Sequence, residues 1–441
     1  MSNKKKIDKE RIFSLVPTFQ YIREHKVLAW VIFFTLILVV LIIKLVTLQN
    51  IDSTIFFGAY SLLVSFYILS RFGLSYFYEK DETDFDENYG PTVSFAIPCK
   101  NEGDHIKETI LRIGKTNYPK DKFDIIAVND GSTDNTLEEM IKAQKEAERM
   151  GVKVMVVDWK MNKGKREGMA ECIKRSKNDI MVFIDSDSFV EPNTARELVK
   201  YFSNKRVGAV AGHAYVANEN KNLLTKMQAV RYYVAFKAYK SAEALFGKVT
   251  CCSGCCSAYR RKYLLPIVDK WLNQRFLGVK CTYGDDRALT NFLLSKNYKA
   301  LYSPTAISYT FVPDTFRVFM RQQLRWKKSW TRESLKASTF MWKTNPVMSL
   351  SFYIGLLLPL LAPFIVIKAL VWYPILNHAL PWFYIFGLVI MAVIYGMYYY
   401  LHTGDKKWPY GILFSSFSTI ILMWQLPYAI MKLKDSSWGT R

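Results

Sequence analysis

Residues 180–187 read Ile-Met-Val-Phe-Ile-Asp-Ser-Asp, an apolar run that stops at two carboxylates, Asp185 and Asp187. A short apolar run is typical of a buried central strand in a parallel sheet. Open α/β folds bind ligands where such strands end, and side chains two residues apart in a strand face the same way. Both carboxylates can therefore face one divalent cation, although an Asp/Ser turn is the alternative. The stretch predicts a strand that ends at a metal–phosphate site.

Three further apolar stretches, which precede this one in the sequence, are also typical of buried strands. Residues 92–98, 123–128 and 152–157 are expected to be strands, and helical patterns separate them. Alternation of strands and helices is typical of an α/β fold with a mostly parallel sheet. The crevice at the carboxyl edge of such a sheet suits a nucleotide.

Apolar blocks on both sides of this region divide the chain. Val27–Val46 and residues 55–74 precede it, and residues 347–373, 382–401 and 410–431 follow it. The first four are long enough to cross a bilayer, which takes about 20 residues. The predicted organisation is a basic N-terminus (1–26), two transmembrane helices (27–78), an α/β domain (79–312), amphipathic interfacial helices (313–345), two transmembrane helices (346–402) and a final segment (403–441).

The distribution of charge predicts the topology. Residues 1–26 carry seven Lys and Arg against three acids, so the positive-inside rule places them in the cytoplasm, and the α/β domain with them. The last block has Lys406 and Lys407 before it, Lys432 and Lys434 after it, and Pro427 within it. We expect it to be re-entrant or to lie along the membrane, with a fifth span as the alternative. The protein is therefore expected to be a multi-pass plasma-membrane protein.

The net charge of +22 has two ordinary explanations, a membrane surface and a nucleic acid. Basic side chains gather in a predicted amphipathic helix at residues 317–332, just before the third span, where they suit an anionic leaflet. The sequence contains no nucleic-acid recognition module, so we expect a lipid bilayer and no nucleic acid as partner. The seven cysteines all lie in the central domain, and their odd number favours reduced thiols.

Other motifs in the central domain carry possible chemistry. Residues 162–166 read Asn-Lys-Gly-Lys-Arg, which can hold a diphosphate at a helix start or be an ordinary charged turn. Asp286 stands at a predicted helix start, as a general base or as a helix cap. Residues 321–326 read Arg-Gln-Gln-Leu-Arg-Trp, in which an indole can support a sugar ring and a guanidinium can neutralise a diphosphate; a solvated amphipathic helix is the alternative.

Four motifs of the central part of the chain follow one another in an order that is found in a known family. They are Asp130-Gly131-Ser132, Asp185-Ser186-Asp187, Asp285-Asp286-Arg287 and Gln322-Gln323-Leu324-Arg325-Trp326. Together they resemble the processive, inverting glycosyltransferases of the GT-A fold, the group that holds cellulose, chitin and hyaluronan synthases. The resemblance covers nearly the whole chain. It is strongest to the hyaluronan synthases, through residues 281–291 and the final Trp438-Gly439-Thr440-Arg441.

The resemblance implies residue roles. Glu102 and Asp130 would seat the uridine, and Lys165 would lie near the phosphates. Asp187, with Asp185, would hold Mg²⁺ or Mn²⁺. The remaining implied roles are a general base (Asp286), a group that stabilises the leaving UDP (Arg325), acceptor binding (Gln322, Trp326 and Cys281) and a gating loop (Trp438 and Arg441).

The resemblance also implies an activity. The chain would polymerise UDP-GlcNAc and UDP-GlcA into hyaluronan and thread the nascent polysaccharide through its own spans. Aromatic residues of the spans could line such a channel or face lipid: Trp372, Trp382, Tyr395 and Tyr398. Alternatives are a chitin-type or poly-GlcNAc synthase, a synthase of another glucuronate-containing capsule, a non-processive transferase to lipid phosphate, and a non-catalytic export scaffold.

The chain departs from the family pattern at two positions. Asn129 stands where the family usually has aspartate, and Cys255 stands where it normally has proline. Cys252 and Cys255 have the spacing of a zinc pair, but no second pair completes a tetrahedral set. His213 is expected to be a pocket-lining or core residue rather than a metal ligand.

Overall fold

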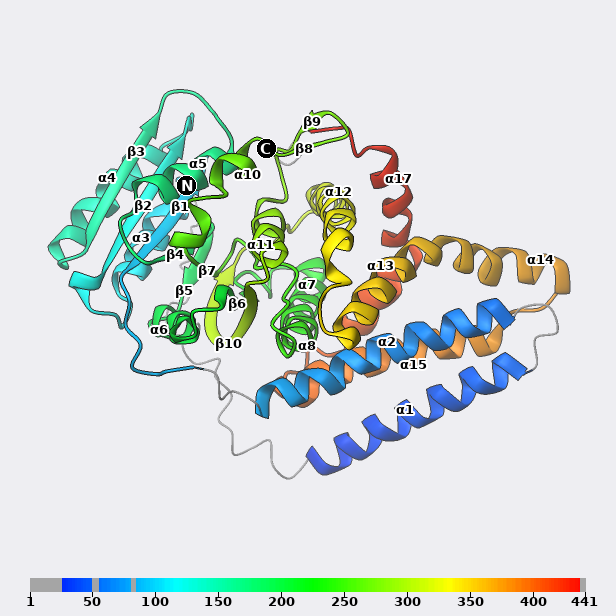
Figure 1. The fold of residues 1–441 in the computed structure, drawn as a ribbon. Helices are drawn as coiled ribbons and strands as arrows, with labels where there is room; N and C mark the ends of the chain where they lie inside the picture. The colour runs from blue at the N-terminus through cyan, green and yellow to red at the C-terminus, as the bar shows by residue number, and fades with distance from the viewer. Residues whose placement is uncertain (1–25, 50–54, 81–84, 437–441) are drawn as a thin grey trace, which may run out of the picture.

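The computed structural model describes residues 26–49, 55–80 and 85–436 (Figure 1). In this part of the chain an eight-stranded sheet forms the centre of the α/β domain, in the order β3-β2-β1-β4-β7-β6-β10-β5. Its strands are β1 (Val93–Cys99), β2 (Phe123–Asp130), β3 (Lys153–Trp159), β4 (Ile180–Phe183), β5 (Ser188–Val190), β6 (Val207–Val216), β7 (Ser257–Arg260) and β10 (Lys299–Thr310). A separate hairpin consists of β8 (Arg275–Phe276) and β9 (Val279–Lys280).

The pairing of the strands confirms the mostly parallel α/β sheet. β1 pairs in parallel with β2 and β4, β2 with β3, and β6 with β10. β7 runs antiparallel between β4 and β6, and β5 runs antiparallel to β10. The four stretches predicted from the sequence correspond to β1 to β4. Their carboxyl ends therefore lie at one edge of the sheet.

The central strands are buried on both faces, which explains their continuous apolar runs. On β2, Ile125 and Ala127 belong to one hydrophobic core, whereas Ile126 and Val128 belong to another. His213 of β6 is 2% exposed and bonds Tyr302 through Nδ1, so it is a core residue. Burial lowers the pKa of His213 to about 3.

Short and medium helices surround the sheet. They are α3 (Ile106–Gly114), α4 (Thr136–Arg149), α5 (Lys165–Arg175), α6 (Thr194–Val199), α7 (Leu223–Val234), α8 (Ser241–Ala244), α9 (Arg261–Leu264), α10 (Val268–Leu272) and α11 (Asp285–Ser295). Two 3₁₀ helices span Lys120–Lys122 and Lys200–Ser203, and a π-helical segment, Ala235–Lys240, joins α7 to α8. The long helix α12 (Phe316–Met341) carries the predicted amphipathic segment and packs on α11.

Apolar helices lie to one side of the sheet, at the lower right of Figure 1. They are α1 (Lys26–Gln49), α2 (Ile55–Lys80), α13 (Pro346–Ile367), α14 (Tyr373–Asn377) and α15 (Trp382–Thr403), with a π-helical turn at Lys368–Trp372 between α13 and α14. α1 contacts α2 and α15, and α2 contacts α13. Within the described residues, three segments are long and apolar enough to cross a membrane: Val27–Val46, Pro346–Asn377 and Trp382–Thr403. The span expected at residues 55–74 is not among them and stays a prediction.

The last apolar block is broken. α16 (Pro409–Ile420) and the segment Leu422–Met431, which contains α17 (Gln425–Met431), meet at an angle of 41°. Such a pair is either one broken span or a re-entrant loop. The re-entrant segment and the fifth span both stay predictions.

Candidate active site

One cavity of about 1250 Å³ opens over the carboxyl edge of the sheet. Three strand ends supply its floor: Lys100 follows β1, Asp130 ends β2, and the residues after β4 contribute Asp185 and Asp187. Because parallel strands end together, residues far apart in the sequence meet here. The two acids that follow the apolar run of residues 180–184 lie in a turn, in which the Ser188 amide donates to the Asp185 carbonyl at 2.9 Å, and this turn lines the cavity.

Asp130 shapes the loop that follows β3. Its Oδ1 accepts a hydrogen bond from the Lys163 amide at 2.6 Å, and its Oδ2 accepts one from the Gly164 amide at 2.9 Å. The residue is 3% exposed, and burial raises the pKa of its carboxyl. Gly164 has φ +102°, a conformation that suits glycine, and α5 begins directly after it. Asp130 thus fixes the basic loop against the cavity.

Lys165, the first residue of α5, pairs with Asp185. Burial disfavours the ammonium of Lys165, but the charges of Asp185, Asp285 and Asp286 outweigh burial and raise its pKa. Gly254 lies against this pair, since a Cβ there would be 3.1 Å from Asp185 Oδ1. The loop that carries Cys255 therefore comes close to this pair of one ammonium and one carboxylate.

Asp286 lies in the first turn of α11, where the sequence predicted a carboxylate at a helix start. Its Oδ1 accepts a hydrogen bond from the Arg287 amide at 2.8 Å, and the Cys251 thiol lies 3.5 Å from its Oδ2. Burial raises the pKa of Cys251 to about 12, so the thiol keeps its proton at neutral pH. Gly284 directly precedes the helix, with a φ of +75°, and a Cβ there would lie 1.9 Å from Ser329 Oγ of α12. Glycine is thus required for α11 to start so close to α12.

The opposite wall comes from α12. Gln322, Arg325 and Trp326 all line the cavity, as does Trp330 one helical turn further on. Arg231 of α7 lies over the Trp326 ring at 5.2 Å. A carboxylate, an indole and guanidinium groups therefore share one space.

Other predicted site residues lie elsewhere. Glu102 is not part of the cavity wall, and its backbone amide bonds Thr136 Oγ1 at 2.8 Å. Cys281 is 3% exposed and lines a separate small pocket with Tyr283 and Arg332. The structure does not bring Cys281 to the acceptor side of the cavity, because its amide bonds Gln274 O at the base of the β8–β9 hairpin. Trp438 and Arg441 lie outside the described residues.

The four aromatic residues expected in a channel do not line the cavity. Trp372 and Trp382 are more than half exposed, the alternative weighed for them from the sequence. Tyr398 stacks on Phe72 at 4.3 Å and packs between helices. Whether an aromatic side chain lines the cavity depends on how helices that are distant in the sequence pack together. The local sequence does not encode this packing.

Several residues of the cavity wall were not predicted from the sequence. Lys100, Arg231 and Glu243 carry charges there, and Trp330 and Tyr67 add aromatic surface. Glu243 of α8 accepts hydrogen bonds from Thr250 N at 2.9 Å and Thr250 Oγ1 at 3.0 Å, which fixes the loop before Cys251. Trp330 follows Trp326 by four residues, and this helical spacing could have predicted that both lie on the same face of α12. Tyr67 and Arg231 come from helices whose apolar pattern gives no such signal.

Among the described residues no group of three or more His, Cys, Asp or Glu side chains could hold a metal ion by itself. Cys252 and Cys256 are fully buried, and burial raises the pKa of each thiol to about 12. A metal between protein and ligand would therefore need oxygen atoms from the ligand.

Comparison with known proteins defines the class. Residues 94–266 match the family model "Glycosyl transferase family 2". A mannosyltransferase from Pyrobaculum calidifontis, solved in complex with GDP-Man and Mn²⁺, is similar in fold: the TM-score is 0.57 at 17% identity, over 82% of this chain and 98% of that one. The chain is a family 2 glycosyltransferase with a GT-A-type fold.

Full-length relatives narrow the assignment. The hyaluronan synthase of Streptococcus pyogenes serotype M3 is 30% identical over 391 residues, which cover 87% of this chain and 90% of the relative. An N-acetylglucosaminyltransferase of Rhizobium leguminosarum bv. viciae is 29% identical over 362 residues, covering 81% of this chain and 83% of that protein. The chain belongs to the hyaluronan synthase family.

Proposed function

We propose that this chain is a processive, inverting glycosyltransferase that polymerises UDP-GlcNAc and UDP-GlcA into hyaluronan and moves the polymer across the plasma membrane. The observation that carries the proposal is one cavity in which the acids of the sheet edge, Asp286 and Trp326 meet and which continues to α2 and α13. A transferase that releases each product has no need of a cavity that reaches the apolar helices. The similarity to hyaluronan synthases supports the choice of sugars.

The nucleotide end of the cavity suits a metal-bound diphosphate. Mg²⁺ and Mn²⁺ prefer oxygen ligands, and Mg²⁺ is commonly held by one or two carboxylates together with substrate phosphates. Asp187 and Asp185 fit this requirement, and Lys165 and Arg325 supply positive charge nearby. A bound cation would neutralise the departing diphosphate. The loop that Asp130 holds would cover the nucleotide, and Glu102 stays a proposed uridine contact.

Asp286 would be the general base. Its Oδ1 accepts the Arg287 amide and its Oδ2 accepts the Cys251 thiol, and the carboxylate would take the proton from the acceptor hydroxyl on a lone pair that these two donors leave open. The hydroxyl oxygen then bonds the anomeric carbon of the donor sugar as the bond to the diphosphate breaks on the opposite side. UDP leaves with the electron pair, and the anomeric configuration inverts.

The acceptor sugar would stack on Trp326, with Gln322 bonding its hydroxyl groups. The C-terminal segment lies at the rim of the same cavity. Ser436 lines it and accepts a hydrogen bond from Thr282, and Asp435 pairs with Lys328 at 3.1 Å. This attachment supports a gating role for Trp438 and Arg441, which follow directly in the sequence.

A second candidate is a chitin-type or poly-GlcNAc synthase. The similarity to an N-acetylglucosaminyltransferase over most of both chains favours it, because UDP-GlcNAc would then be the single donor. The proposed topology, with the catalytic domain in the cytoplasm, is the same for both candidates, since UDP-sugars are cytoplasmic.

The test is to incubate purified, lipid-reconstituted protein with each UDP-sugar alone and with the pair, in Mg²⁺ or Mn²⁺. High-molecular-weight polymer that requires both UDP-GlcNAc and UDP-GlcA, and that hyaluronan lyase degrades, is the expected result. Polymer from UDP-GlcNAc alone would support the second candidate. Release of UDP with only single-sugar products would overturn processive synthesis, and chelation of the metal should stop UDP release in either case.

A further inference from the structure

The cavity does not end at the proposed acceptor site. It continues past Trp330 of α12 to Tyr67 of α2 and to Gly355 and Pro359 of α13, in the apolar part of the protein. Trp326 and Trp330 are four residues apart and so project from one side of α12. The cavity thus has a nucleotide end at the sheet and a membrane end between α2 and α13.

Tyr67 lies directly against the backbone of Gly355. A Cβ added at Gly355 would be 2.4 Å from Tyr67 Oη, closer than real Cβ atoms come, and 3.0 Å from Cζ. Gly355 does not have a positive φ, so a substitution there acts through this contact, by displacing the phenol of Tyr67, and not through backbone strain. The buried Arg71 guanidinium lies over the Tyr67 ring at 4.9 Å and supports it from behind. At this place the two helices come together through a phenol and a glycine.

Two prolines in the same stretch of α13 leave backbone carbonyl groups without their usual helical hydrogen bonds. Pro359 has no N–H, so the carbonyl of Gly355 has no helical donor four residues later. Pro363 repeats the effect for the carbonyl of Pro359. Residues 355, 359 and 363 lie on one face of the helix, and the first two line the cavity. A helix that is otherwise apolar therefore offers backbone acceptors at the membrane end.

We infer that Tyr67, Gly355 and Pro359 form a carbohydrate-binding subsite at the point where the nascent chain leaves the cavity. Sugar hydroxyls donate to the carbonyls of Gly355 and Pro359 and bond the phenol of Tyr67, which narrows the passage when it rests on Gly355. Carbohydrate suits this place, because it has hydroxyl donors for the carbonyls and apolar faces for Trp326 and Trp330. This inference rests on the proposed polymerase function.

The experiment compares Gly355→Ala, Tyr67→Phe and the double variant in lipid-reconstituted protein, by product length and by UDP release. Two matched controls come from α2. Gly73→Ala places a methyl group where nothing lies within 4 Å. Tyr60→Phe removes a hydroxyl that bonds the Leu358 carbonyl at 2.9 Å but lies outside the cavity wall. Calorimetric UDP binding shows that each variant is folded.

Gly355→Ala is expected to give chains several-fold shorter than wild type, with UDP binding unchanged. Tyr67→Phe alone should shorten them less. The double variant should recover part of the length lost in Gly355→Ala, because the phenyl ring lacks the oxygen that the new methyl group would meet. Both controls should match wild type. Unchanged product length in Gly355→Ala, or no recovery in the double variant, would overturn the subsite. Wild-type protein that binds UDP but makes no polymer would instead overturn the proposed function, and the subsite with it.

Discussion

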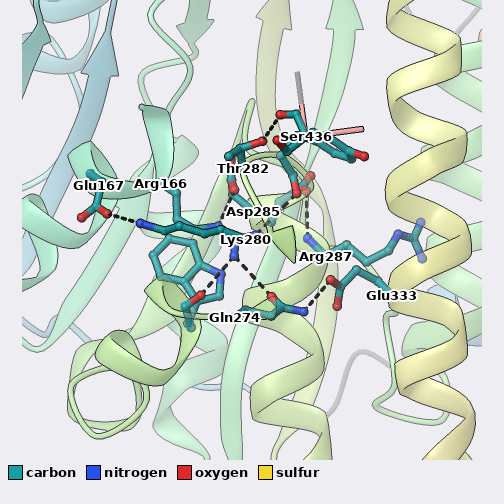
Figure 2. A network of polar contacts seen from close by, with 12 residues as sticks. Arg166, Glu167, Gln274, Lys280, Thr282, Asp285, Arg287, Glu333 and Ser436 are labelled. Atoms are coloured by element: carbon teal, nitrogen blue, oxygen red, sulfur yellow. Dashed lines mark hydrogen bonds and ion pairs between the residues drawn. The ribbon is translucent and has the colours of Figure 1, made fainter. Parts of the chain in front are cut away.

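The guanidinium of Arg166 and the carboxylate of Asp285 form a buried ion pair at 2.8 Å, with side chains that are 4% and 5% exposed. Arg166 also donates to the Trp271 carbonyl at 3.0 Å and to Gln274 at 3.3 Å, and Gln274 donates to Glu333 of α12 at 2.8 Å (Figure 2). The network joins α5, α11 and α12. Asp285 immediately precedes Asp286 in the chain. The network therefore fixes the proposed base, Asp286, relative to α12, the cavity wall that carries Trp326.

Replacing Arg166 with methionine should therefore destabilise the protein. A buried carboxylate left without its partner costs about 3–5 kcal/mol. Lys174→Met is the matched control, because it breaks an exposed pair from the same helix, Lys174 with Asp269 at 2.9 Å, worth about 0–1 kcal/mol. Thermal unfolding in detergent measures both. Equal melting temperatures for the two variants would show that the buried pair does not hold α11.

Gly254→Ala should weaken binding of UDP in the presence of Mg²⁺ or Mn²⁺. The new methyl group would lie 3.1 Å from Asp185 Oδ1 and 3.4 Å from Lys165 Nζ, and so displace the groups proposed to meet the metal and the diphosphate. We expect a dissociation constant about tenfold higher, or roughly 1.4 kcal/mol. Gly90→Ala, whose Cβ would make only ordinary contacts, is the control for calorimetry. Unaltered affinity in Gly254→Ala would place the diphosphate elsewhere.

The lowered pKa of Lys327 leads us to expect that the KM for UDP-sugar depends on pH. Burial, together with the charge of Arg231, lowers the pKa of Lys327 to about 8, and the residue lines the cavity. The ammonium is therefore charged below about pH 8 and loses its charge above it. If this charge attracts the anionic donor, the KM for UDP-sugar should rise between about pH 7 and about pH 9.

Lys327→Arg should remove this rise, because arginine stays protonated throughout the range. Lys343→Arg, outside the cavity wall, is the control and should keep the wild-type profile. The measurement is KM against pH for the three proteins. A KM for wild-type protein that does not change with pH would contradict a role for the Lys327 charge.

Local sequence could predict the nucleotide end of the site but not the membrane end. Asp130 and Asp185 stand at the ends of apolar strands, and their place could be predicted because all parallel strands end at one edge of the sheet. Tyr67 and Gly355 are about 290 residues apart, and their contact depends on how α2 packs on α13.

The position of Cys281 was unpredictable for a similar reason. A motif next to Asp286 in sequence is expected to lie near it in space. The β8–β9 hairpin, however, bonds the Cys281 amide to Gln274, which leaves the thiol in a separate pocket beside Tyr283. The orientation of a short hairpin follows from its tertiary contacts, and these involve Glu167 and Glu333, which are remote in the sequence (Figure 2).

Asp286 is proposed to be the base in a cavity that binds UDP-sugars. The direct measurement is polymer formation and UDP affinity for Asp286→Asn beside Asp269→Asn, an exposed aspartate outside the cavity. We predict that Asp286→Asn lowers polymer formation by at least about a hundredfold while it still binds UDP, and that Asp269→Asn retains full activity. Polymerisation at the wild-type rate by Asp286→Asn would contradict the account.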